Sequence, residues 1–462
     1  MQKPIDIGTN RQLFLDDYVI DSMSGAKRVI HSPTRREAVI VGDKPWDRAS
    51  VSYMSVIRDG DLYRGYYRCD HEGSDKREGS PRHTAYAEST DGIHWEKPIL
   101  GLHEFEGSRD TNLVWLSPGA NMCVFIDGNP AEPPERRYKA VVRTGRLEGE
   151  ALGAPGPCVL ALSSPDGINW GLMQDAPILT DDPFDSFNIA FWDEWTHLYV
   201  IYTRGVGGSD GPFKGGVRWI RRATSDDFLN WSGLELIDTG EVPSEHLYTN
   251  SCVPYERSPG TYLMFPSRLV LDHTPDPDWV GGPGVNDIVF MSSRDGITWD
   301  RTFKEAFIRP GQDYENWHER GVYFERGIFQ TSPDTLSMYC SDHWRYPTTR
   351  ISRYTLRTDG FVSVNAGHRG GEFTTKPIVF EGSELEINYS TSAVGSVQVE
   401  IQDEQGRPER GFSLADSPEQ YGDKIDHRVS WTGGADISTF TGRPVRLRFV
   451  LKDADLFAFK FN

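Results

Sequence analysis

Short segments rich in aromatic and β-branched residues recur along the chain and predict strands. The segments "LYRGYYR" (62–68) and "HLYVIYTR" (197–204) are two of them, and such residues suit the pleated surface of a sheet. Turn-forming residues, 46 Gly and 29 Pro in all, separate these segments because both types favour turns over regular structure. We therefore expect an all-β protein.

One motif, an Asp-Gly pair followed by Trp, returns along the chain. It reads "STDGIHWE" from Ser89, "SSPDGINWG" from Ser163, "TSDDFLNWS" from Thr224 and "SSRDGITWD" from Ser292, with a weaker copy, "RTDGFVSVN", from Arg357. The repeated acids, Asp91, Asp166, Asp226, Asp295 and Asp359, are 75, 60, 69 and 64 residues apart. This spacing is too long for a helical solenoid and fits a four-stranded propeller blade with long loops. Five repeats predict a five-bladed β-propeller.

The repeated Asp residues have a structural explanation. An Asp side chain can accept hydrogen bonds from the backbone of the turn that it begins, and Gly takes the positive φ that the turn needs. The Trp then begins the next strand and can cover the gap between blades. We expect these residues to fold the blades and not to catalyse a reaction.

The pattern changes after Gly367. Alternating apolar and polar residues at 385–389 and 397–401 are typical of half-buried strands. We predict a propeller over residues 1–368, which would hold the active site, followed by an accessory β-sandwich over 369–462. The segment "LFLDDYVID" (13–21) is expected to complete the last blade and so close the ring, although Asp16 or Asp17 could instead approach the axis.

Charge and composition limit the partners. The 462 residues carry a net charge of −19 and no dense Lys/Arg run, which argues against nucleic acid and anionic membrane surfaces. The chain has no stretch of about 18 apolar residues, the length that a helix needs to span a bilayer. The first residues do not resemble a signal peptide, so we expect a cytoplasmic protein, or a periplasmic or secreted one if a leader was removed. The oligomeric state stays open.

The five cysteines are never closer than 35 residues. This spacing fits neither a CxxC metal site nor a dense disulfide framework, and it predicts buried free thiols. The chain also lacks a Gly-x-Ser-x-Gly elbow, a Walker loop, a dinucleotide fingerprint and a His-x-x-x-His pair.

A carboxylate stands near the start of the first strand of each predicted blade. Because the inner strands of a propeller converge on its axis, these side chains could meet in a central funnel. The five candidates are Asp47, Asp110, Asp185, Glu245 and Glu319. Paired carboxylates are what glycosidic bond cleavage requires, one ionised and one holding a proton. Aromatic residues near the same positions, Trp46, Tyr53, Trp192, Tyr248, Trp317 and Trp344, could stack on sugar rings.

The repeats, the carboxylates and the C-terminal sandwich together resemble the five-bladed propeller glycosidases, the superfamily of fructan hydrolases and invertases and of arabinofuranosidases. The segments "KPWDRAS", "PFDSFN" and "SEHLYTN" answer its three signature motifs in degraded form. The resemblance implies that Asp47 is the nucleophile or base, that Asp185 stabilises the transition state, and that Glu245 is the acid. It also implies an exo-acting glycoside hydrolase on a furanoside, fructoside- or arabinoside-like, or on another small glycoside.

Further polar and aromatic residues are candidates for binding an oligosaccharide, polysaccharide or small glycoside: Trp46, Asn188, Tyr248, Asn250, His318, Glu319, Arg320 and His343. Two alternatives stay open. The propeller could bind a glycan without cleaving it, or it could be a phosphorylase or a lyase, for which Arg48, His318 and Arg320 would supply an anion site. No cofactor is expected, apart from an optional calcium ion in the funnel, and no residue is assigned as a metal ligand.

Overall fold

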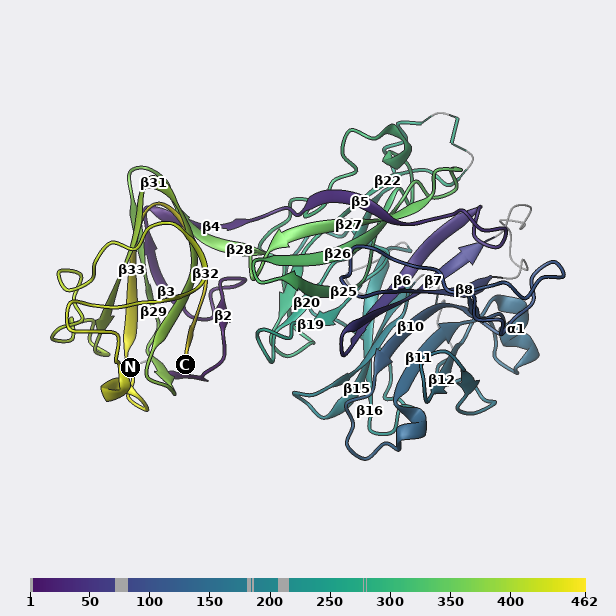
Figure 1. The fold of residues 1–462 in the computed structure, drawn as a ribbon, viewed down its shortest axis with the longest axis horizontal. Coiled ribbons are helices and arrows are strands. Elements are labelled where there is room, and N and C mark those ends of the chain that lie inside the picture. The colour runs from purple at the N-terminus through teal and green to yellow at the C-terminus, as the bar shows by residue number, and fades with distance from the viewer. Residues whose placement is uncertain are drawn as a thin grey trace.

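The computed structural model describes residues 3–70, 82–180, 184, 187–206, 216–276, 278–279 and 281–462. Its regular structure is almost entirely β, which confirms the all-β class. The described helical segments are α1 (Arg146–Ala151) and three single 3₁₀ turns, η1 (Pro134–Arg136), η2 (Tyr314–Asn316) and η3 (Ser438–Phe440). None of the described helices is long and apolar enough to cross a membrane. Figure 1 shows a large lobe and a smaller one that contains both ends of the chain.

The large lobe is built from antiparallel sheets whose strands mostly follow one another in sequence. The first sheet contains β6 (Ser50–Asp59), β7 (Leu62–Asp70), β8 (His83–Ser89) and β9 (Leu113–Trp115). The second contains β10 (Ala120–Ile126), β11 (Tyr138–Arg143), β12 (Val159–Ser164) and β13 (Gly171–Leu172). The third contains β14 (Ile189–Asp193), β15 (Leu198–Val206), β16 (Arg218–Ser225) and β17 (Glu235–Leu236).

The remaining sheets of this lobe are less regular. Residues 246–300 form two sheets, one of β18 (His246–Leu247), β21 (Ser267–Val270) and β22 (Val285–Ile288), the other of β19 (Val253–Pro254), β20 (Tyr262–Met264), β23 (Met291–Ser293) and β24 (Trp299–Asp300). The last sheet contains β25 (Val322–Ser332), β26 (Thr335–Asp342), β27 (Arg350–Arg357) and β5 (Thr34–Val41). One parallel residue pair between β25 and β6 joins this sheet to the first. The count of five blades therefore stays a prediction.

The first strands of neighbouring sheets lie against one another. β6 contacts both β10 and β25, and β10 also contacts β14. The first residues of these strands are therefore gathered in one region of the large lobe, although they are far apart in sequence.

Four of the five repeated motifs form the predicted turn. In the second copy, Oδ1 of Asp166 accepts hydrogen bonds from the N–H groups of Ile168 and Asn169, both at 2.8 Å. Partial burial raises the pKa of this carboxyl, but these bonds and that from the Asn169 side chain outweigh it and bring the pKa to about 2. The phenol of Tyr66, on the neighbouring sheet, donates to the carbonyl oxygen of Gly167. The motif thus closes its own turn and ties two sheets together.

The third copy differs in the residue that does this work. Asp227, not Asp226, accepts the N–H groups of Leu229 and Asn230, at 2.9 and 2.7 Å. The position of the Gly belongs to Phe228, which has φ of +68°. Its buried ring packs against Phe125 and Tyr199, and this packing offsets the cost of a left-handed backbone for a bulky residue.

The small lobe is a sheet wrapped around its own apolar core. Its strands are β2 (Gln12–Leu13), β3 (Ile20–Ser24), β4 (Ala26–Ile30), β28 (Val362–Ala366), β29 (Gly371–Thr375), β31 (Leu385–Gln402), β32 (Asp423–Arg428) and β33 (Arg446–Phe461). β1 (Ile5–Gly8) pairs with β30 (Ile378–Phe380) beside them. The two long strands, β31 and β33, pair along most of their length. Phe373, Phe449 and Phe459 are among the rings that fill the core.

The N-terminal segment does not close the ring of the large lobe as expected for residues 13–21. β2 pairs with β33 of the small lobe, because the apolar side chain of Phe14 belongs to the core of that lobe. It is β5 that pairs with β27 of the last sheet. The division at residues 368 and 369 stays a prediction, and the strand pairing adds residues 5–30 to the C-terminal lobe.

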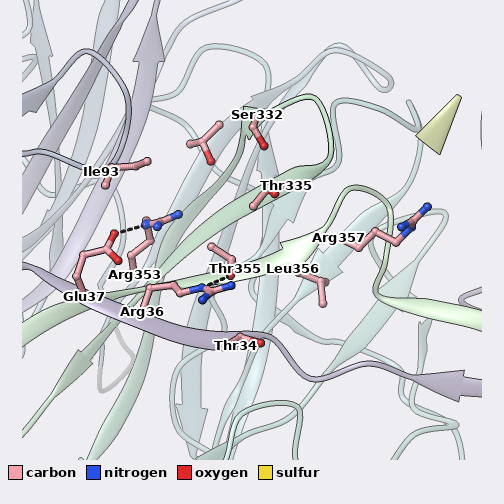
Figure 2. A pocket seen from close by; sticks show the side chains of 11 residues that line it. Thr34, Arg36, Glu37, Ile93, Ser332, Thr335, Arg353, Thr355, Leu356 and Arg357 are labelled. Carbon is pink, nitrogen blue, oxygen red and sulfur yellow. Dashed lines mark hydrogen bonds and ion pairs between the residues drawn. The ribbon is translucent and has the colours of Figure 1, made fainter. Parts of the chain in front are cut away.

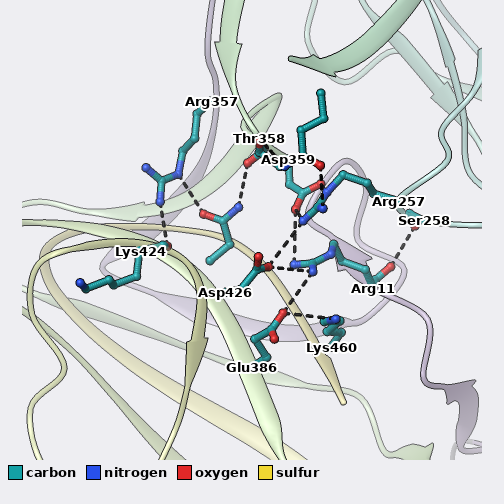
Figure 3. A network of polar contacts seen from close by, with 12 residues as sticks. Arg11, Arg257, Ser258, Arg357, Thr358, Asp359, Glu386, Lys424, Asp426 and Lys460 are labelled. Carbon is teal, nitrogen blue, oxygen red and sulfur yellow. Dashed lines mark hydrogen bonds and ion pairs between the residues drawn. The ribbon is translucent and has the colours of Figure 1, made fainter. Parts of the chain in front are cut away.

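A polar network holds the two lobes together (Figure 3). Its centre is Asp359, the weak fifth copy of the motif, which is fully buried. Its carboxylate accepts two hydrogen bonds from Arg257, at 2.9 and 3.0 Å, and one from the phenol of Tyr255 at 2.6 Å. Arg11 lies 3.3 Å from the same carboxylate and also contacts Glu386 of β31. This copy therefore serves the contact between lobes.

The five cysteines are all buried and unpaired. The prediction of buried free thiols is therefore confirmed.

Candidate active site

Three tyrosine rings are stacked where the first strands meet. Tyr53 lies on β6, Tyr323 on β25 and Tyr248 just after β18. The ring of Tyr323 is 5.7 Å from each of the other two, with interplanar angles of 21° and 4°. Trp344 stands edge-on to Tyr53 and Tyr323, at 5.4 and 5.5 Å. We call this group the aromatic stack.

Guanidinium groups surround the aromatic stack. Their central carbons lie 5.3–5.9 Å from the ring centroids, a distance at which a cation is attracted to the face of an aromatic ring. The residues concerned are Arg68, Arg204, Arg218 and Arg320. Arg68 is held by Asp70, which accepts two hydrogen bonds from it at 3.2 and 2.6 Å.

A cavity of about 160 Å³ opens beside the stack, and we call it the axial pocket. Its polar lining comes from six elements or the loops beside them. The lining includes Arg218, Tyr248, Ser267, Asn286, Glu319, Arg320, Tyr323 and Arg345. A volume this small suits one sugar residue rather than a long oligosaccharide.

Glu319 is the carboxylate among the residues that line the axial pocket. Its Oε2 lies 2.9 Å from Nε of Arg320, and its Oε1 lies 3.5 Å from Nη1 of Arg345. The N–H of Gly282 donates to Oε1 at 3.2 Å. Three donors thus fix the orientation of this carboxylate toward the pocket.

The electrostatic setting differs between the two arginines that hold Glu319. Burial opposes the charge on Arg320, but Tyr248, Tyr323 and Glu319 outweigh it and raise the pKa of this group. Burial together with the nearby charge of Arg320 lowers the pKa of Arg345. An additional negative charge in the pocket would therefore favour the charged form of Arg345.

His318 lies next to the pocket as a neutral side chain. It is 2% exposed, and its ring stacks on Trp279 at 3.7 Å. Burial lowers the pKa of His318 to about 4. Its Nδ1 is 2.5 Å from the carbonyl oxygen of Glu319, so Nδ1 carries the proton and Nε2 is an acceptor. Nε2 has no hydrogen-bond partner among the described residues.

Several site residues have an unusual backbone. Tyr53, Arg320, His343 and Arg345 have φ values of +51°, +67°, +57° and +67°. Such conformations cost energy for residues other than glycine and occur often at functional sites. On β6 the left-handed residue coincides with a shift of register between Ser52 and Ser55, which turns the Tyr53 ring toward Tyr323.

Some of the residues predicted from the sequence meet at this site. Tyr248, Glu319 and Arg320 line the axial pocket, and His318 adjoins it. Asn188 is buried just before β14, and the ring of its neighbour Phe187 packs on Tyr53 at 5.6 Å.

Asn250 is occupied within the fold. Its side-chain nitrogen lies 3.5 and 3.3 Å from the carbonyl oxygens of Phe187 and Tyr202, and its Oδ1 accepts the N–H of Cys252. It supports the inner strands and does not line the pocket.

Asp47 is placed away from the pocket lining. It is 0% exposed, and its oxygens accept hydrogen bonds from the N–H of Lys44 at 2.7 Å and from Nζ of Lys97 at 2.6 Å. Burial raises the pKa of this carboxyl, although Lys97 opposes the shift. Trp46 beside it is buried and donates to Asn112. These contacts hold Asp47 and Trp46 within the fold, and their parts in catalysis and binding stay predictions from the sequence.

Glu245 also lies outside the pocket lining. One of its oxygens is 3.3 Å from Arg268 and the other 2.6 Å from Arg301, so both are held in ion pairs. Asp16, the alternative near the N-terminus, pairs with Arg294 at 2.8 Å. The third predicted catalytic residue, Asp185, lies outside the described residues.

His343 belongs to a cluster that could be mistaken for a metal site. Asp313, Glu315 and His343 offer ligand atoms within 4.8 Å of one another. However, a guanidinium nitrogen of Arg350 lies 3.0 Å from Asp313 and 3.1 Å from Nε2 of His343, and Arg35 contacts Asp313 as well. Two guanidinium groups already contact Asp313, and Glu315 lies against His343, which makes the group an ion-pair network. A calcium ion in the funnel stays a prediction.

The sequence interpretation did not identify most of the arginines. Arg68 and Arg204 end the same aromatic strand in two repeats, "LYRGYYR" and "HLYVIYTR", and this shared ending was the available signal. Arg218 begins β16, and Arg345 follows β26 in "CSDHWR". Neither stands at the start of an inner strand, the position that marks the carboxylates predicted from the sequence.

A second, more open groove lies on the outer side of the last sheet (Figure 2). It has a volume of about 520 Å³ and is lined mainly by threonine, serine and arginine side chains. Its charged groups already have partners: Arg353 donates to Glu37 at 2.5 Å, and Arg36 donates to Thr355 at 2.9 Å. No aromatic residue lines it. The axial pocket is therefore the stronger candidate.

Comparison with known proteins gives an architectural similarity only. No protein-family model and no curated protein matches the chain. Solved structures that match include a thermostable family-43 glycoside hydrolase, with 14% identity, a TM-score of 0.45 and coverage of 72% of this chain and 95% of that one. A β-1,2-mannobiose phosphorylase from Listeria innocua has 15% identity, a TM-score of 0.48 and coverage of 71% and 97%.

A third match is an N-acetylgalactosamine deacetylase from F. plautii in complex with blood group B trisaccharide, with 13% identity, a TM-score of 0.48 and coverage of 73% and 97%. At these scores the matches carry no argument about chemistry, which has to come from the chain's own residues.

Proposed function

We propose that the chain is a carbohydrate-active enzyme that cleaves a glycosidic bond in the axial pocket. The observation that carries the proposal is the oriented carboxylate of Glu319 beside stacked tyrosine rings. A sugar ring can pack its apolar face on such rings while its hydroxyl groups bond polar neighbours. Glycoside cleavage then needs a carboxylate at the anomeric carbon and an acid at the leaving oxygen.

Glu319 suits the part of the nucleophile or base. Its oxygens form ion pairs with two guanidinium groups and accept one N–H, and groups of this kind stabilise a negative charge. If Glu319 is the base, it takes a proton from water, the water oxygen bonds to the anomeric carbon, and the bond to the leaving oxygen breaks as a general acid gives that oxygen a proton. If Glu319 is the nucleophile, its oxygen bonds to the anomeric carbon first, and water then cleaves this glycosyl–Glu319 bond. Asp185 keeps the part that the resemblance gives it, stabilisation of the transition state, as a prediction from the sequence.

The exo mode and the furanoside substrate are finer parts of the proposal. The small volume of the axial pocket supports the removal of single terminal residues. The furanoside comes from the resemblance of the sequence to fructan hydrolases and arabinofuranosidases, and it is one arm of the test.

A phosphorylase is the second candidate, and the arginines of the pocket favour it. Arg218, Arg320 and Arg345 could hold inorganic phosphate in place of the attacking water. A panel of furanosides and pyranosides, incubated with and without phosphate, separates these reactions. If products form only when phosphate is present, the protein is a phosphorylase and not a hydrolase. If a glycan binds but is not cleaved, the protein is a glycan-binding module.

Two matched variants test which carboxylate acts. We expect Glu319→Gln to reduce turnover by about 10²–10⁴-fold, the range for loss of a group that transfers a proton or attacks, and Glu245→Gln to stay near the wild-type rate. The measurement is kcat on the substrate found in the panel, with thermal unfolding to show that both variants are folded. The reverse result would return the catalytic part to Glu245.

A further inference from the structure

We infer that the axial pocket selects a sugar residue that carries a carboxylate, such as a uronic acid. This inference rests on the proposed function, because it names the substrate class of the same site. It follows from the charges, the unpartnered polar atoms and the aromatic wall of the pocket.

The charges of the pocket lining are unbalanced. Three arginines, Arg218, Arg320 and Arg345, line it against the single carboxylate of Glu319 among the described residues. Arg68 behind them is matched by Asp70, and His318 is neutral at pH 7 because burial lowers its pKa to about 4. The whole chain has a net charge of −19, so a positive pocket is a local feature. Such a pocket concentrates anions.

Buried polar atoms at the pocket lack partners among the described residues. Nε of Arg218 has no acceptor and Oδ1 of Asn286 has no donor. Asn286 is 1% exposed, and its nitrogen already donates to Ser267 at 2.6 Å. Buried polar groups are normally hydrogen-bonded. These atoms therefore indicate a ligand that both accepts and donates, as a hydroxylated acid does.

The pocket already shows how it would hold a carboxylate. Arg320 contacts one oxygen of Glu319 and Arg345 contacts the other, as guanidinium groups do with planar anions. Arg218 also lines the pocket and lies over Tyr248 at 5.3 Å. A ligand that reaches Arg218 therefore lies against the tyrosine rings. A sugar acid uses both features, whereas inorganic phosphate has no apolar face for the rings.

The test compares acids with their neutral counterparts. We expect glucuronic or galacturonic acid to bind at least about 10-fold more tightly than glucose or galactose in calorimetry at low salt, because a charge-assisted hydrogen bond is worth about 10- to 100-fold. The preference should shrink as salt is added. Equal binding of acid and neutral sugars, or binding of phosphate alone, would overturn the inference.

Two arginine variants locate the effect. Arg345→Gln should lower the preference for the acid about 10-fold or more, while Arg36→Gln, an exposed arginine of the outer groove, should leave it unchanged. Arg218→Gln is a second pocket variant in case Arg345→Gln fails to fold. A preference that survives both pocket variants would also count against the inference.

The inference and the proposed function can fail separately. If the protein cleaves neutral glycosides and shows no preference for acids, the function stands and the inference falls. If acids bind through Arg345 but no glycoside is cleaved, the inference stands and the enzyme proposal falls.

Discussion

Glu325 lies on β25, two residues beyond Tyr323, and is 0% exposed. Its Oε2 accepts the N–H of Met54 at 2.5 Å, and burial raises the pKa of the carboxyl to about 8. Between the ordinary Glu pKa and pH 8, the folded protein keeps a proton that the unfolded chain releases. The free energy of unfolding should therefore fall as pH rises through this window, by at most about 1.4 kcal/mol per pH unit.

Glu325→Gln removes this titration, so its stability should change less between pH 5 and pH 8 than that of the wild type. Urea unfolding at both pH values measures the difference, and Glu150→Gln, an exposed residue of α1, is the control with wild-type behaviour. An identical pH dependence in Glu325→Gln and wild type would show that the carboxyl is not protonated in the folded state.

The position of a residue in the sequence predicted that it belongs to the site only where the start of an inner strand determines what that residue contacts. Tyr248, Glu319 and Arg320 stand there and line the pocket. Asp47 and Glu245 stand at similar positions, but Lys97, and Arg268 with Arg301, hold their oxygens. Those partners are distant in sequence, so the pattern of the chain could not show that the carboxylates were already paired.

At the scale of elements, Asp227 and Asp226 form a natural pair for comparison. Asp227 accepts four hydrogen bonds within its turn, from the N–H groups of Leu229 and Asn230, from the Asn230 side chain and from the Ser225 hydroxyl. Asp227→Ala should destabilise the fold by about 1–2 kcal/mol, as loss of a comparable capping side chain does. Asp226→Ala should cost much less, because the hydrogen bonds of the turn go to Asp227 and not to this neighbour.

The effect of Asp227→Ala should depend on pH. Hydrogen bonds outweigh partial burial and bring the pKa of Asp227 to about 2, so its contribution is complete above the ordinary Asp pKa and disappears as pH falls toward 2. Thermal unfolding at pH 7 and pH 3 measures this. If Asp226→Ala lowered the unfolding temperature more than Asp227→Ala does, the assignment of the turn to Asp227 would be wrong.

The periodic sequence predicted the strands and turns well, because each turn is closed by residues within one short motif. It placed the third acid one residue early, since Phe228 stands where the pattern has Gly. The expected closure of the ring by residues 13–21 was wrong for another reason. Those residues and β5 are both apolar enough for a strand, and only the core of the small lobe, with Phe14 inside it, decides between them.

At the scale of the molecule, the contact between lobes depends on groups that no local pattern connects. Arg11 comes from the N-terminal segment, Arg257 from the large lobe and Asp426 from β32, and all three meet around Asp359 (Figure 3). The sequence pattern presents Asp359 as part of a weaker copy of the turn motif. Its role follows from the paths of distant segments, which the sequence alone does not supply.

Asp359→Asn should loosen this contact, because the amide keeps the shape but removes the buried negative charge that Arg11 and Arg257 share. Arg11 keeps its contacts with Glu386 and Asp426, so we expect a loss no larger than that of a buried pair that loses one member. Removing one member of a buried ion pair costs about 3–5 kcal/mol. We expect a lower unfolding temperature and faster proteolysis between the lobes, while Glu384→Gln, which breaks an exposed pair with Arg428, should cost less than about 1 kcal/mol. Ligand binding in the axial pocket should persist in folded Asp359→Asn, since no residue of the network lines that pocket. Loss of binding without loss of stability would show that the small lobe shapes the site, which would contradict an accessory role.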